Sequence, residues 1–166
     1  MMLLTPRVLL VALAGAVACA TSNRPTPATG SARWTGNFRT AGTSSSAILN
    51  TATTDSQGSA FGSIMVVNAD SVPPTSHVDL TMSAPALSGK ELAWAIFAGP
   101  CGAATPPVAS LQEFPPLSVS SGNARVSTDL RFRLAPGSEY HANVYASYRA
   151  NDVANVLMCT NLTLGR

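Results

Sequence analysis

Residues 91–102 read ELAWAIFAGPCG and join a strand pattern to a cysteine. Two sets of apolar side chains alternate along this stretch: Leu92, Trp94 and Ile96 in one set, and Ala93, Ala95 and Phe97 in the other. Because successive side chains of a strand point to opposite faces, the alternation predicts a strand with one face on the core. Gly99 and Pro100 then end the strand, since proline cannot donate to the ladder, and Cys101 is expected on the loop that follows.

Working outward from this stretch, the chain from residue 32 reads as short strands separated by turn residues. Eight further segments have strand patterns: 33–39, 45–54, 61–67, 77–82, 114–120, 124–133, 140–146 and 154–162. The alternation is clearest in 124–133, whereas 61–67 is almost continuously apolar, which fits a strand covered on both faces or one with a bulge at Gly62. The sequence therefore predicts an all-β fold, an antiparallel Greek-key sandwich or barrel of about eight strands.

Composition limits the classes of partner. The chain has 166 residues, of which 46% are hydrophobic and 11% charged, and its formal net charge is +2. Removal of a leader would leave roughly 135 to 145 residues, enough for one domain with a core. The basic residues stand singly, whereas phosphate binding needs clustered positive charge. We expect no nucleic-acid partner.

The first 18 residues have the pattern of a signal peptide. Arg7 precedes an apolar run that is shorter than the roughly 20 residues of a membrane span. Cys19 directly follows the small residues 16–18, AVA, which resembles the lipobox of bacterial lipoproteins, whose cysteine is lipidated and becomes the mature N-terminus. Ordinary cleavage after this A-x-A site is the alternative.

The lipobox resemblance implies a domain organisation and a location. Residues 1–18 would be the leader, 19–31 a flexible polar tether, and 32–166 the β-domain. The membrane would be a partner through lipid on Cys19, in the bacterial cell envelope. Ala20, where an aspartate could stand, favours the outer membrane if the host is Gram-negative.

The two other cysteines form an even pair if Cys19 carries lipid. In an oxidising compartment, Cys101 and Cys159 are then expected to form a disulfide. Two buried free thiols are the alternative.

The second half of the chain, from about residue 78 to 162, resembles the copper/zinc superoxide dismutase family and related lipoprotein domains. WAIFAGPCG keeps the family's aromatic residue, glycine and first disulfide cysteine, at Trp94, Gly99 and Cys101. SEYHANVYAS is similar to the strand that carries its last copper histidine, and VLMCTNL to the strand with its second disulfide cysteine. The resemblance implies that the strand ending before Cys101 and the strand carrying Cys159 lie side by side.

The family's metal ligands are missing from this sequence. Ala95, Phe97 and Tyr145 stand at the positions of copper-binding histidines, and residues 102–113 contain neither histidine nor aspartate. These side chains cannot supply imidazole nitrogens to copper, so we expect no catalytic residue, no metal and no cofactor. The three residues are instead expected to lie together on the outward face of adjacent strands. That patch would either pack under the loop 102–112 or contact a ligand.

The two histidines of the chain, His77 and His141, are expected to be solvated surface residues. His141 shares a strand face with Tyr145 but lies four residues away, roughly 13 Å along a strand and too far for one metal ion. Nucleophile motifs such as Gly-x-Ser-x-Gly are absent from the sequence.

The sequence thus favours a non-catalytic, lipid-anchored envelope protein whose degenerate dismutase-like domain is a binding or scaffold module. One alternative is a metal-binding or dismutase-like enzyme with atypical ligands. Another is a purely structural envelope protein. The sequence identifies neither an envelope protein nor a small molecule as the ligand.

Overall fold

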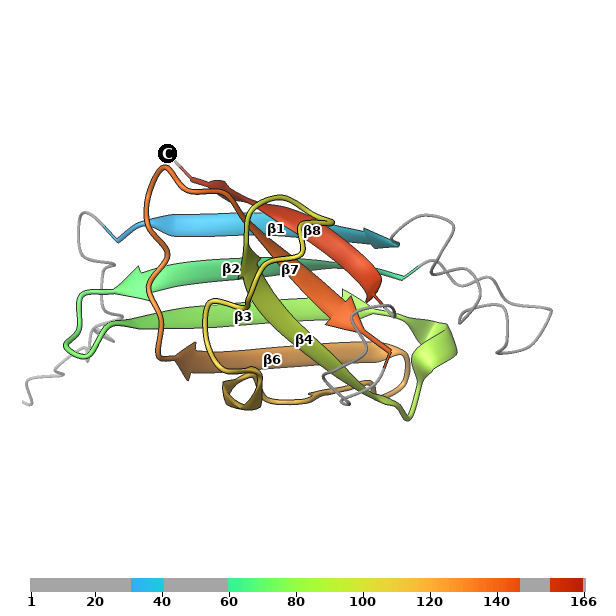
Figure 1. Cartoon of the computed structure of the whole chain (residues 1–166). Coiled ribbons are helices and arrows are strands. Elements are labelled where there is room, and N and C mark those ends of the chain that lie inside the picture. Colours follow the sequence, from blue (N-terminus) through green and yellow to red (C-terminus); the bar gives the residue numbers. More distant parts are fainter. Residues whose placement is uncertain (1–30, 41–59, 147–155, 166) are drawn as a thin grey trace, which may run out of the picture.

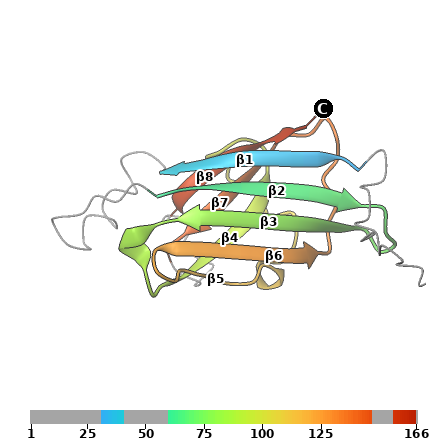
Figure 2. The ribbon, with the colours of Figure 1, turned by 180° about the vertical axis from the view of Figure 1, so that it is seen from behind.

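The computed structural model describes residues 31–40, 60–146 and 156–165. Their eight antiparallel strands are β1 (Arg33–Thr40), β2 (Phe61–Ala69), β3 (Thr75–Ser83), β4 (Glu91–Ala98), β5 (Leu117–Ser118), β6 (Asn123–Leu130), β7 (Tyr140–Tyr145) and β8 (Val156–Leu164). They form one sheet in the order β5-β4-β7-β8-β1-β2-β3-β6. Figures 1 and 2 show this sheet curling into a nearly closed, barrel-like shape. The predicted all-β antiparallel fold is confirmed.

The chain builds this sheet by crossing repeatedly between its two halves. Strands β1, β2 and β3 lie side by side, and the chain then passes through a 3-10 turn, η1 (Pro85–Leu87), to β4 in the other half. It continues through a second turn, η2 (Leu111–Glu113), and β5, and returns to β6 beside β3. A further crossing leads to β7 beside β4, and β8 fills the place between β7 and β1. The strand expected over 45–54 lies outside the described residues.

Strands β2, β3 and β6 follow the period-2 pattern. β3 buries alternate residues: Ser76, Val78, Leu80 and Met82. β2 does the same, with Met65 and Val67 only half-buried, so the expectation that 61–67 is covered on both faces is wrong. The suggested bulge at Gly62 is also wrong, because both neighbouring ladders run through this residue. A glycine is needed there since a Cβ atom would collide with the Thr81 carbonyl.

Strands β4 and β7 differ, because both of their faces are buried. All five residues from 92 to 96 are buried, as are those from 140 to 144, so the expectation of a single core face for β4 is wrong. The connection after β4 folds back along this strand (Figure 1), where the Val108 N–H donates to the Ile96 carbonyl at 2.9 Å. Val108 and Ala109 then pack against the core. A segment distant from β7 in sequence therefore supplies part of the cover.

The edge strand expected over 114–120 is reduced to the two residues of β5. Pro115 and Pro116 have no N–H to donate to a ladder. Phe114 turns inward instead, meeting the Trp94 ring edge-on with centroids 5.0 Å apart. The Trp94 Nε1–H donates to the Pro115 carbonyl at 2.8 Å, which fixes the proline segment against the core without strand pairing.

Candidate functional site

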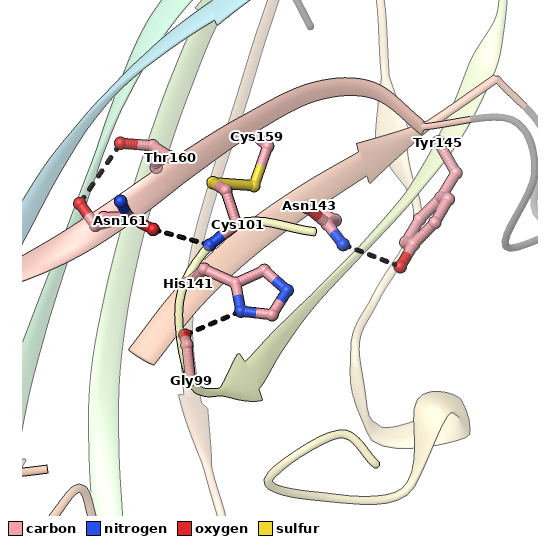
Figure 3. The surroundings of a disulfide bond; sticks show 8 residues. All are labelled: Gly99, Cys101, His141, Asn143, Tyr145, Cys159, Thr160 and Asn161. Carbon is pink, nitrogen blue, oxygen red and sulfur yellow. Dashed lines mark hydrogen bonds between the residues drawn. A yellow bond between two sulfur atoms is a disulfide. The ribbon is translucent and has the colours of Figure 1, made fainter. Parts of the chain in front are cut away.

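A disulfide ties the connection after β4 to the last strand. The sulfur atoms of Cys101 and Cys159 lie at bonding distance, with Cα atoms 6.0 Å apart, so the pairing is present and the alternative of two free thiols is not. Next to it, the Cys101 N–H donates to the Asn161 side-chain oxygen at 2.7 Å (Figure 3). This connection is therefore fixed to β8 by one covalent bond and one hydrogen bond. The expectation that the two strands lie side by side is wrong, because β7 lies between β4 and β8 and the connection reaches across it.

Beneath this connection lies the outward side of β4, β7 and β8, which we call the closed face. It brings together the three residues at the expected copper-ligand positions: Ala95 pairs with Asn143 across the β4–β7 ladder, Phe97 with His141, and Tyr145 with Ala93. Tyr145 thus reaches Phe97 diagonally, with ring centroids 6.4 Å apart. Ala95 is fully buried, so the three residues do not form an exposed patch. Phe97 also forms an isolated β-bridge with Pro107 of the connection, so the connection covers this residue as the other expectation had it.

His141 is the main correction to the sequence analysis. Its expected solvated position is wrong, because the side chain is 0% exposed. The Nδ1 atom lies 2.8 Å from the Gly99 carbonyl, and the ring stacks on Phe97 with centroids 5.2 Å apart. Period 2 correctly assigns His141 to the outward side, but the connection after β4 covers that side. Strand order carries no signal for this burial, because β3, which carries the exposed His77, also lies between two other strands.

The sequence analysis also missed Asn143, which lies on the closed face between His141 and Tyr145. Its Nδ2 donates to the Tyr145 hydroxyl at 3.2 Å, as Figure 3 shows. Burial raises the pKa of the Tyr145 phenol above its ordinary value, and this hydrogen bond acts in the opposite direction. The closed face is therefore a mainly apolar surface crossed by a short line of polar groups.

The other histidine lies as expected on the outward side of β3 and β6, which we call the open face. His77 Nδ1 is 2.7 Å from Asp129, and Nε2 is 3.2 Å from the Ser127 hydroxyl, so the three groups have the connectivity of a serine, histidine and aspartate relay. Asp79, however, lies 3.4 Å from the same Nε2 and would repel the oxyanion of an acyl-transfer reaction. The Asp129 side chain is 75% exposed. The cluster is a solvated ladder of cross-strand pairs.

A surface hollow with a volume of about 390 Å³ lies where the start of β2, at Phe61, meets the end of β3, at Ser83. It is lined by Phe61, Gly62, Ser63, Thr81, Met82, Ser83 and Asn123. The Phe61 side chain is 60% exposed, unusually high for an aromatic residue in a strand. Sequence patterning could not reveal this hollow, because residues of β2 and β3 and Asn123, far apart in sequence, line it together.

Within the described ranges, no three histidine, cysteine or acidic side chains are grouped closely enough to hold a metal ion. The same ranges contain no helix that is both long and apolar enough to cross a bilayer. No family model, curated protein or solved structure matches this chain.

Proposed function

We propose that this chain is a non-catalytic protein of the bacterial cell envelope, anchored by lipid on Cys19, whose disulfide-bonded β-domain is a binding or scaffold module. We further propose that the domain is a degenerate relative of the copper/zinc superoxide dismutases. The proposed relationship rests on the order of Trp94, Gly99, Cys101 and Cys159 along the chain. We call the domain degenerate because the family's copper-binding histidines are missing.

The packing of the closed face is the observation that carries the non-catalytic proposal. At the positions where the resemblance expects copper ligands, the Phe97 ring stacks on His141 and meets Tyr145 edge-on. Ala95 is completely buried beside them. Carbon atoms and one phenol thus stand where a copper site needs several imidazole nitrogens.

The metal content of the purified mature protein tests this proposal. We expect substoichiometric copper and zinc, and superoxide decay no faster than in matched buffer. Stoichiometric metal with dismutase activity would instead support the alternative of an enzyme with atypical ligands. A Phe97→Leu variant is a useful control, because it keeps an apolar side chain and adds no metal ligand.

The lipid anchor is tested separately. Cys19 lies outside the described residues, so its role rests on the sequence pattern alone. We expect the protein to partition with membranes and a Cys19→Ala variant to be released or left unprocessed. An unchanged mature mass and unchanged membrane association of that variant would count against lipidation.

The hollow at Phe61 favours a binding role over a purely structural one, because an exposed aromatic beside a hollow is typical of contact surfaces. We expect Phe61→Ser to reduce capture of specific partners from envelope extract. Val72→Ser is the matched control, since Val72 is fully exposed and lies in the turn between β2 and β3. Equal capture by both variants would remove this support.

A further inference from the structure

Two buried polar atoms on the closed face have no hydrogen-bond partner among the residues that the structure describes: His141 Nε2 and Asn143 Oδ1. Their side chains are 0% and 8% exposed, so bulk water does not reach them freely. Unpaired buried polar groups are rare in folded proteins because burial removes their hydrogen bonds to water. The two residues are neighbours on one side of β7, and Figure 3 shows both beside the disulfide. His141 contacts Gly99 of the connection, and Asn143 pairs across the sheet with Cys159.

Both of these atoms are hydrogen-bond acceptors. The Gly99 carbonyl can only accept, so the His141 Nδ1 at 2.8 Å must carry the ring proton, which leaves a lone pair on Nε2. Asn143 donates through Nδ2 to Tyr145, which leaves Oδ1 as its acceptor. Two acceptors cannot satisfy each other. The partner they require is a donor with two hydrogens.

The neighbours of His141 favour a neutral donor. The Phe97 ring from β4 stacks on the imidazole, the Gly99 carbonyl of the connection accepts its proton, and Asn161 of β8 pairs with it across the sheet. None of these groups carries a negative charge. A bound ammonium ion would therefore be a buried cation with no carboxylate among these described neighbours, which is strongly unfavourable.

We propose that His141 Nε2 and Asn143 Oδ1 form a buried binding site for one water molecule, which donates one hydrogen to each. The water completes a polar line from the Gly99 carbonyl through His141 and Asn143 to the Tyr145 hydroxyl. Buried waters typically satisfy polar groups in this way. The line links the connection after β4 to the end of β7, close to where the disulfide links the same connection to β8. This site does not depend on the proposed function.

Nuclear magnetic resonance of the full mature protein tests the site directly. We expect nitrogen shifts of His141 that report a proton on Nδ1 and none on Nε2, together with cross-peaks from a long-lived water to the imidazole carbon-bound hydrogens. Two results would overturn the proposal. One is a protonated Nε2. The other is a dry site in which the Asn143 amide is turned around and donates directly to the ring.

Variants add an independent measurement. His141→Phe and Asn143→Leu each remove one acceptor and leave the other without its shared water. The losses in unfolding free energy should therefore be strongly non-additive. The double variant should unfold at a denaturant concentration no lower than the less stable single variant. His141→Phe combined with Ser63→Ala, on a distant strand, is the additive control. Additivity in both pairs would contradict a shared water. If the single variants fail to fold, the spectra of the unchanged protein decide the question.

Discussion

The closed face and the open face are outward sides of the same sheet, and each carries one of the two histidines of the chain. On the open face, His77 is 43% exposed and contacts two carboxylates. On the closed face, His141 is fully buried against Phe97 and a backbone carbonyl. Their strand patterns look alike, so the difference comes from the disulfide-bonded connection that covers one face. Strand alternation assigns a side chain to a face, but distant segments decide whether that face meets solvent.

Removing the disulfide that holds the connection over the closed face should have the largest effect on stability. Replacing both cysteines, Cys101→Ser with Cys159→Ser, removes a link that spans 58 residues of sequence. Chain entropy predicts a loss of about 4 kcal/mol in the free energy of unfolding, as an upper figure. Urea unfolding of the double variant measures the loss, and reduction of the unchanged protein is the control. A loss under about 1 kcal/mol would mean that the connection is held without the bond.

Two phenylalanine substitutions compare the stability cost of removing a packed ring with that of removing an exposed ring. Phe97→Ala removes a ring that packs against the core, His141 and Tyr145, and should cost about 2 kcal/mol, less than for a fully buried ring. Phe61→Ala removes an exposed ring and should change stability by no more than about 0.5 kcal/mol. Urea midpoints of both variants give the comparison. Equal losses would contradict the packing of Phe97 on the closed face.

The smallest expected effect is on the alkaline side. Because burial raises the pKa of Tyr145 above its ordinary 10.0, the folded protein keeps the phenolic proton at a pH where the unfolded chain loses it. The stability that results is fully present below pH 10 and is lost as pH rises through the folded pKa. Unfolding measured at several pH values across this range should show a steeper decline for the unchanged protein than for Tyr145→Phe. Parallel curves would indicate that Tyr145 is solvated.

The sequence predicted the strands that have one solvated face. In β3 and β6, alternation at positions such as Val78 and Leu130 follows directly from a core on one side and water on the other. The apolar pattern that starts at Glu91 and ends before Gly99 and Pro100 also located β4. These elements are recognisable because the relevant forces act within each strand.

The cover over β4 and β7 was not predictable in the same way. The connection 99–110 has no strand or helix pattern of its own, and its position depends on a bond to Cys159 and a backbone hydrogen bond to Ile96. His141 was therefore expected to be a surface residue, and Asn143 was missed. The three residues at the expected copper positions do lie near one another. Period 2 put Ala95 and Phe97 on one face, but only the family resemblance put Tyr145 opposite them, because β4 and β7 are far apart in sequence.

Carbethoxylation of the histidines tests the contrast between the two faces most directly. The chain contains only two histidines, so one peptide mass analysis after brief treatment with diethyl pyrocarbonate reports on both. His77 should be modified in the folded protein, and His141 should become reactive only after denaturation with reduction of the disulfide. Modification of His141 at the same rate as His77 in the folded, oxidised protein would contradict the closed face.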